Sequence, residues 1–138
     1  MTRQILFLMV LAGLLSAQSG TVPCCHCEGS GRTDDVVCLD GKEMRDHLDH
    51  LEPLKPSGLD KGLNLAGIVV VEVRFDSVGK VDCARAKSGH PIAISAALTA
   101  IKKWTFRPVV SGGVAKSGCG SVTIKYRLRD QGSSTKLQ

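Results

Sequence analysis

Apolar and polar residues alternate most clearly between residues 67 and 76. One face of this stretch is apolar and the other is charged: Val69, Val71, Val73 and Phe75 against Glu72, Arg74 and Asp76. A period of two in β-branched residues predicts a half-buried strand. Residues 77–79 predict a tight reversal, because Gly79 can take a positive φ, and residues 80–87 then return as the second strand of a hairpin.

An amphipathic helix is predicted after the hairpin. Pro91 suits the first helical turn, and His90 before it is expected to cap the helix or to be solvated. The apolar residues that follow recur at helical spacing and form one stripe: Ile94, Ala97, Leu98 and Ile101.

A last strand is predicted from Ser121 to Leu128, where apolar and polar residues alternate again. The order strand, strand, helix, strand predicts an α+β fold with a small three-stranded antiparallel sheet and the helix packed on one face. A right-handed crossover puts the third strand beside the first, so that the spatial order is 2-1-3. The last strand would then lie at an edge, whose unpaired N–H and C=O groups must be protected or used.

The N-terminal region predicts export. Arg3 precedes an apolar run from Ile5 to Leu15, and small and polar residues follow, which is typical of a secretory leader cleaved after Ser19. A periplasmic mature protein is expected. The predicted segments are a signal peptide over 1–19, a Cys-rich extension with a short strand and helix over 20–52, a folded domain over 53–130 and a flexible tail over 131–138.

Short elements are predicted ahead of the main strand. Residues 36–39 are expected to form a strand, residues 42–51 a short amphipathic helix, and residues 58–63 a helix whose N-cap is Ser57.

Composition narrows the function. A chain of 138 residues fits one domain, and an aromatic content of 4% argues against a deep cofactor pocket, so no cofactor is expected. The net charge of +5 favours acidic partners, but the basic residues are scattered without an aromatic platform, and nucleic acid is not expected as a partner. No Ser/His/Asp or Cys/His triad can be assembled, so no catalytic residue and no enzyme activity are predicted.

Several short runs carry a family resemblance: Gly67–Val73, Gly79–Val81, Ser88–Pro91, Trp104–Pro108 and Tyr126–Leu128. Together they resemble the C-terminal domain of TonB-type energy transducers over residues 67–128. Members of that family dock an extended segment of an outer-membrane receptor, the TonB box, beside their last strand. The resemblance implies a partner-binding edge at Val122, Thr123, Ile124, Lys125, Tyr126 and Arg127.

The chain also departs from the pattern of a working transducer. We expect no membrane-spanning N-terminal helix and no long Pro-rich spacer, and Lys55 occupies the Tyr position of the Pro-x-Tyr-Pro element of the family. The leading prediction is therefore a periplasmic module that binds a receptor or another envelope protein by strand addition and reaches the membrane only through its partners. A free edge would also allow a homodimer. The main alternative is a disulfide-stabilised structural or envelope-assembly domain without a transport role.

Six cysteines in an exported chain predict disulfides. Cys83 and Cys119 are expected to pair at one end of the sheet. Two strand spacings of about 4.8 Å exceed the Cα separation of about 6.8 Å that a disulfide spans, so this bridge requires Cys119 in a loop that arches over the first strand. A second bridge is expected between Cys38 and one of Cys24, Cys25 or Cys27, with Cys27 preferred.

Residues 24–31 also fit the Cys-x-x-Cys-x-Gly-x-Gly knuckle of DnaJ-type zinc repeats. One knuckle supplies only part of the four ligands that tetrahedral zinc needs, and no metal site is predicted. A zinc or thiol-redox protein centred on Cys24 and Cys27 remains a third reading.

Overall fold

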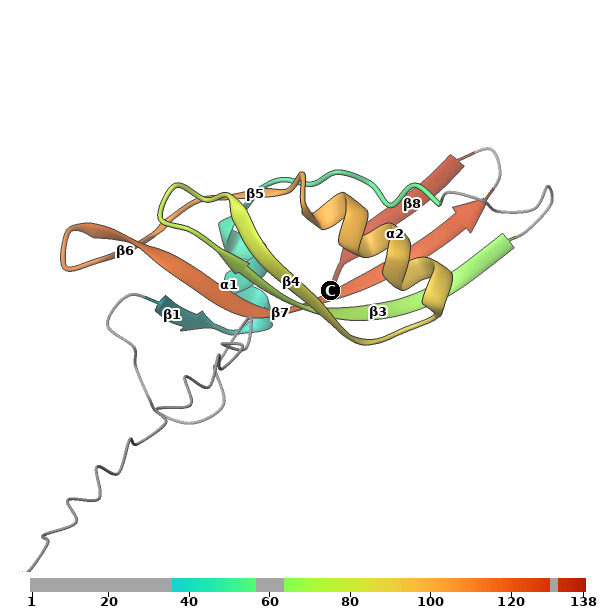
Figure 1. Cartoon of the computed structure of the whole chain (residues 1–138), viewed down its shortest axis with the longest axis horizontal. Helices are drawn as coiled ribbons and strands as arrows, with labels where there is room; N and C mark the ends of the chain where they lie inside the picture. Colours follow the sequence, from blue (N-terminus) through green and yellow to red (C-terminus); the bar gives the residue numbers. More distant parts are fainter. Residues whose placement is uncertain (1–35, 57–63, 130–131) are drawn as a thin grey trace, which may run out of the picture.

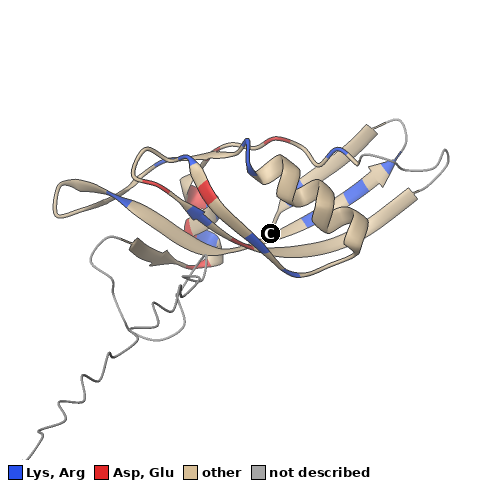
Figure 2. Cartoon of the chain, in the orientation of Figure 1, with Lys and Arg blue, Asp and Glu red and all other residues tan. Residues whose placement is uncertain are grey.

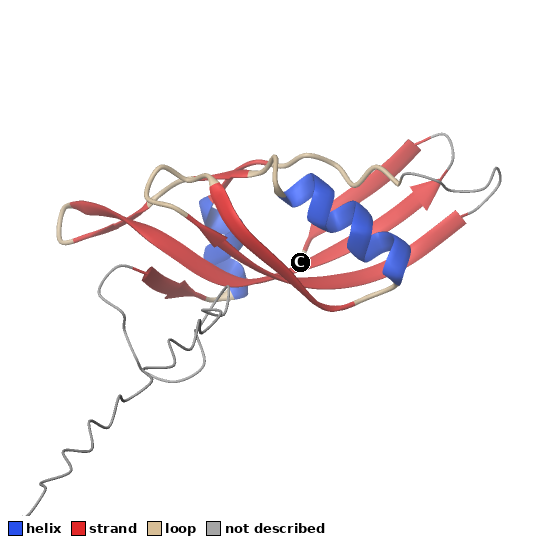
Figure 3. Ribbon diagram, viewed as in Figure 1, coloured by secondary structure: helices blue, strands red, loops and turns tan. Residues whose placement is uncertain are grey.

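The computed structural model describes residues 36–56, 64–129 and 132–138. Figure 1 shows a long, strongly twisted sheet with a helix lying across it, and Figure 3 distinguishes its helices and strands. The elements in chain order are β1 (Val36–Leu39), α1 (Gly41–His47), β2 (Leu48–His50), β3 (Asn64–Phe75), β4 (Val81–Ser88), α2 (Pro91–Ile101), β5 (Thr105–Phe106), β6 (Val109–Ser111), β7 (Val114–Arg129) and β8 (Gly132–Leu137). The predicted leader and the predicted helix over 58–63 lie outside the described residues.

The strands β3 and β7 form the centre of the sheet. They pair antiparallel over the whole of β3, from Asn64 opposite Arg129 to Phe75 opposite Gly118. The hairpin partner β4 lies on the other side of β3. The spatial order β4-β3-β7 confirms the predicted order 2-1-3.

The prediction of a three-stranded sheet was wrong, because the sheet of the described residues has six strands. β1 pairs with β7 in parallel, while β6 and β8 pair with it antiparallel. These added strands are short, and β8 carries the polar sequence Gly-Ser-Ser-Thr-Lys-Leu, so neither length nor alternation identified it. The end of the chain, which we predicted to be a flexible tail, is therefore a strand over residues 132–137.

The last long strand begins earlier than predicted, at Val114 instead of Ser121. Gly118 and Gly120 interrupt its apolar alternation. Both positions are crowded on the core face: a Cβ on Gly118 would lie 2.3 Å from the Phe75 ring, and one on Gly120 would lie 2.6 Å from Met44. The glycines thus make room for two large side chains to pack against the strand. Because glycine has no side chain, they also remove the apolar alternation from which a strand is predicted.

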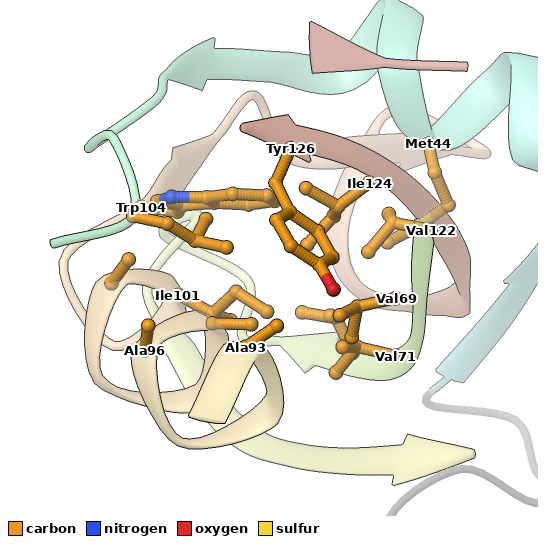
Figure 4. Close-up of a cluster of buried hydrophobic side chains, with 14 of the residues drawn as sticks. Met44, Val69, Val71, Ala93, Ala96, Ile101, Trp104, Val122, Ile124 and Tyr126 are labelled. Atoms are coloured by element: carbon orange, nitrogen blue, oxygen red, sulfur yellow. The ribbon is translucent and has the colours of Figure 1, made fainter. Parts of the chain in front are cut away.

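The core fills one face of the sheet, the inner face. Figure 4 shows the helix and strand side chains meeting there. Helix α2 approaches through small residues, since Ala93, Ala96, Ala97 and Ala100 are buried together with Ile101. Of the predicted stripe, Ala97 and Ile101 are buried, whereas Ile94 and Leu98 are only partly buried. Alanines permit close contact with the sheet, which is why the buried stripe differs from the one drawn by the larger residues.

Two further contacts close this core. The buried Trp104 donates from its indole Nε1 to the carbonyl oxygen of Glu52, at 2.9 Å, and Leu54 nearby is fully buried. At the N-terminus of α2, the Ile92 N–H donates to Nδ1 of His90 at 3.3 Å, which confirms His90 as the cap. The segment around Glu52 and Leu54, which precedes β3 in the chain, is therefore anchored to Trp104 just after the C-terminus of α2.

Helix α1 belongs to the same fold. Asp40 and Glu43 form a capping box, in which each side chain accepts a hydrogen bond from the other residue's backbone N–H. Met44 is fully buried beside Val122, as Figure 4 shows, and the His47 carbonyl accepts from the Arg107 N–H at 2.6 Å. Helix α1 therefore packs onto the inner face through Met44, while β1 before it extends the sheet and β2 after it pairs with β5.

The conformation and close packing of Gly79 in the β3–β4 turn lead to a stability prediction. Gly79 has φ +88°, and an added Cβ would lie 1.7 Å from the Phe106 carbonyl oxygen. We expect Gly79→Ala to lower the free energy of unfolding by about 3 kcal/mol or more, because both strain and a backbone clash arise. The matched control is Gly112→Ala, where φ is +61° and nothing lies within 4 Å, so only about 1 kcal/mol of strain is expected. Urea unfolding followed by circular dichroism compares them, and equal losses would contradict the clash.

Candidate functional site

The six residues predicted to bind a partner all lie on β7, but they divide between its two faces. Val122, Ile124 and Tyr126 point into the core, and Tyr126 is 4% exposed. Burial raises the pKa of the Tyr126 hydroxyl. Only Thr123, Lys125 and Arg127 lie on the opposite, outer face, so a partner would meet these side chains and the β7 backbone.

The β7 edge in this region is paired within the chain. Strand β8 runs antiparallel beside it, from Ile124 opposite Leu137 to Arg129 opposite Gly132. The Gln138 N–H extends the pairing by donating to the Thr123 carbonyl oxygen at 2.9 Å. The expectation of an open edge was therefore wrong, because β8 occupies it.

Strand β8 is held mainly through polar groups. Its one large apolar side chain that packs against the core is that of Leu137, which is only partly buried. Two hydrogen bonds join it to Leu54: the Leu54 N–H donates to Thr135 Oγ1 at 3.1 Å, and Ser133 Oγ donates to the Leu54 carbonyl. Gly and Ser gain little from a pleated, half-buried surface, so β8 is intrinsically a weak strand.

The outer face of β7 and β8 carries a basic groove, which we define by Ile68, Lys125, Arg127, Ser134 and Lys136. It encloses about 550 Å³ and is also bordered by Ala66, Gly67 and Tyr126. Ile68 contributes an apolar side chain to the groove and is 50% exposed. A second hollow of about 400 Å³ continues along Arg127 and Arg129 to Gly132–Ser134. Figure 2 shows Lys and Arg positions along this part of β7.

The charges of the groove differ from those elsewhere on the outer face. On β3 and β4, Glu72 forms ion pairs with Arg85 at 2.9 Å and Lys87 at 3.6 Å, and Arg74 pairs with Asp82 at 2.8 Å. Within the described residues, no carboxylate forms such a pair with the cations of the groove. Among the described residues, the cations of the groove thus have no carboxylate within pairing distance, an arrangement that suits an anionic ligand.

Sequence reasoning identified Lys125 and Arg127 but missed Arg129, Lys136 and Ile68. The alternation of Lys125, Arg127 and Arg129 was available as a clue to a basic face. Lys136 could not be added from the sequence, because its place in the groove depends on the unexpected pairing of β8.

The cysteines within the described residues lie in one row across the outer face. Cys83 and Cys119 are both opposite Arg74, on its two sides, and Cys119 is also opposite Cys38. Cys119 lies within β7, so the loop position that the expected Cys83–Cys119 bridge requires is not present. All three are disulfide-bonded. Cys24, Cys25 and Cys27, including the expected partner of Cys38 and the knuckle, lie outside the described residues.

Two further properties apply to the part of the chain that the structure describes. It contains no cluster of three or more His, Cys, Asp or Glu side chains arranged to hold a metal ion. None of its helices combines the length and the apolar character that crossing a membrane requires.

A comparison with known proteins identifies the family of the central domain. A family model described as Gram-negative bacterial TonB protein C-terminal matches residues 61–128, from just before β3 into the last part of β7. No curated protein and no solved structure matches the chain. Domains of this family are protein-interaction domains of envelope transport that engage outer-membrane receptors. The central sheet and α2 of this chain therefore form a domain of the TonB C-terminal family.

Proposed function

We propose that this chain is a periplasmic binding module that takes up an extended, acidic segment of an envelope protein by strand addition to β7. An outer-membrane receptor is the partner class that the family match favours. The observation that carries the proposal is the pairing of β8 with β7 over residues 124–129, the edge at which a partner strand would bind.

β8 supports this proposal because it provides the backbone groups that an incoming segment would replace. An added strand gains affinity from main-chain hydrogen bonds and specificity from alternate side chains. The β7 residues 124–129 already make such a ladder with β8, so the edge has the geometry of an antiparallel acceptor. A segment with more β-branched residues than β8 would form the same ladder with better packing.

The part of the basic groove on β7, Lys125 and Arg127, remains when β8 is displaced and adds a preference for acidic segments. Side chains at every second position of an added strand face the outer side, where Lys125 and Arg127 present their charges. Carboxylates at those positions would gain Coulomb attraction without displacing an existing ion pair. The attraction acts mainly on the association rate and on the choice of partner.

Removal of β8 should increase the affinity for such a segment. We compare the chain with a variant that ends at Arg129, using a synthetic extended peptide rich in Val and Glu. The intact chain must release β8 before it binds, and each 1.4 kcal/mol of that cost weakens apparent affinity about tenfold. We therefore expect the shortened chain to bind about tenfold or more tightly in calorimetry.

The control for this experiment is a Leu137→Ser variant, which weakens the β8 anchor and keeps the full length. Its affinity should fall between those of the other two chains. Circular dichroism establishes that each variant is folded, and sedimentation separates peptide binding from pairing of two copies through the opened edge. Unchanged peptide affinity in a folded, monomeric shortened chain would contradict strand addition at β7.

Charge reversal tests the groove separately. The double variant Lys125→Glu/Arg127→Glu should weaken binding of the acidic peptide by about thirtyfold or more at low salt, because each of the two contacts contributes about 1 kcal/mol in water and reversal adds repulsion. Raising the salt should reduce the difference. The matched control is Lys102→Glu/Lys103→Glu, which changes the net charge equally on exposed residues just after α2. An equal loss in both variants would show net charge, and not the groove, to be responsible.

A further inference from the structure

Two lysines lie directly opposite each other where β8 pairs with β7, side by side in Figure 1. The antiparallel register places Lys136 of β8 opposite Lys125 of β7, and both residues are exposed. Opposed side chains of such a pair have Cβ atoms about 5 Å apart, and like charges at these positions weaken the pairing. The paired position of β8 therefore brings two positive charges together, and no carboxylate of the described residues lies within pairing distance of either.

The hollow beside this lysine pair has room for a ligand. The groove encloses about 550 Å³ and is lined by both lysines, Arg127 and Ile68. It continues into the hollow of about 400 Å³ that Arg127 and Arg129 line, since Arg127 and Ser134 border both. β8 places small residues opposite these arginines, Ser134 opposite Arg127 and Gly132 opposite Arg129. Cations and a serine hydroxyl thus border one continuous hollow.

The donors around this hollow favour a phosphate group over a carboxylate. A phosphate carries up to two negative charges and several strong acceptor oxygens, so it can accept hydrogen bonds from Lys125 and Lys136 together. The guanidinium of Arg127 adds a fork of donors that matches phosphate oxygens. A carboxylate carries a single charge and would balance only one of the two lysines. Ile68 adds an apolar surface for the organic part of a phosphate ester.

We propose that the basic groove, with β8 in place, binds a phosphate group between Lys125 and Lys136, and that this ligand stabilises β8 on β7. The complete site exists only while β8 is paired, because Lys136 and Ser134 leave the groove with the strand. A ligand that binds the paired state better than the open state shifts the equilibrium toward the paired state. The phosphate therefore supplies the counter-charge that the lysine pair needs.

The same site would regulate strand addition, and this consequence alone rests on the proposed function. A partner strand replaces β8 and meets only the cations of β7, whereas the phosphate requires the cations of both strands. The two ligands thus exclude each other, although both are anionic. By reciprocity, the phosphate lowers the affinity for the partner by the same factor as the partner lowers the affinity for the phosphate.

Hydrogen exchange of the β8 amides, residues 132–137, tests the site in the intact chain without any peptide. The probe is inorganic pyrophosphate at about ten times its half-saturating concentration, and sodium chloride at the same ionic strength is the reference. We expect pyrophosphate to slow the exchange about tenfold, because a ligand of the paired state alone stabilises that state in proportion to its saturation. Equal slowing by chloride would show screening of the lysine pair and would overturn the site.

Lys136→Gln tests the lysine pair itself. Without phosphate, its β8 amides should exchange about twofold more slowly than those of the unaltered chain, because the repulsion across the pair is lost. With pyrophosphate they should slow little further. Lys136→Arg should keep the response, and so should the matched control Lys102→Gln, which removes one charge from an exposed residue just after α2. A full response to pyrophosphate in Lys136→Gln would overturn the proposal.

A vesicle experiment distinguishes a soluble phosphate from a lipid headgroup. The chain is sedimented with phosphatidylglycerol vesicles, and phosphatidylcholine vesicles, whose headgroups carry no net charge, are the control. Binding to phosphatidylglycerol that Lys136→Gln loses and Lys102→Gln keeps assigns the phosphate to a lipid. Slowed exchange with pyrophosphate and no such vesicle binding assigns it to a soluble ligand. If neither effect depends on Lys136, the proposal is wrong.

The regulatory consequence is measured with the synthetic peptide rich in Val and Glu. Pyrophosphate at the same concentration should weaken peptide binding to the intact chain about tenfold. Slowed β8 exchange in a chain that does not bind the peptide would support the phosphate site and contradict strand addition. Unchanged β8 exchange in a chain that binds the peptide would overturn the phosphate site alone.

Discussion

The pairing of β3 with β7 is the interaction on which the rest of the structure depends. It joins residues 64–75 to residues 118–129 without interruption, across more than forty positions of intervening chain. Every other strand of the main sheet pairs with one of these two. The register also fixes the two faces: the apolar alternation of both strands falls on the inner side, where the alanines of α2 reach it, and the cations and cysteines fall on the outer side. A shift by one residue would exchange the faces and expose the core.

The sequence predicted the parts of the fold in which local pattern and tertiary position agree. The alternation of residues 67–76, the turn at Gly79 and the proline at the start of α2 each pointed to the element that forms. The predictions that failed concern positions where tertiary contacts oppose the local pattern. Gly118 and Gly120 lie inside β7 because Phe75 and Met44 need the space, and β8 forms from a polar sequence because β7 offers it unpaired backbone groups.

The candidate site also combines features that local sequence pattern predicts with features that only tertiary pairing determines. The β7 edge and its charged residues Lys125 and Arg127 follow from alternation and from the family resemblance. The occupation of that edge does not follow, because it depends on a strand pairing that has no apolar signature. The groove around Lys136 is a consequence of this pairing and could be recognised only once the register of β8 was known.

The weakness of β8 also bears on the colloidal behaviour of the protein. The β7 backbone groups to which we propose that a partner binds belong to a strand edge, and edges of this kind join sheets when proteins aggregate. A strand that covers them prevents such pairing between copies of the chain, and under the proposed strand addition it must also be displaced by a better-matched segment. The glycine, serines and single partly buried leucine of β8 are consistent with a weakly held strand, and its lysine adds a charge that disfavours pairing with further strands. If a partner strand replaces β8, the stability of Gly132–Leu137 has a lower bound set by solubility and an upper bound set by recognition.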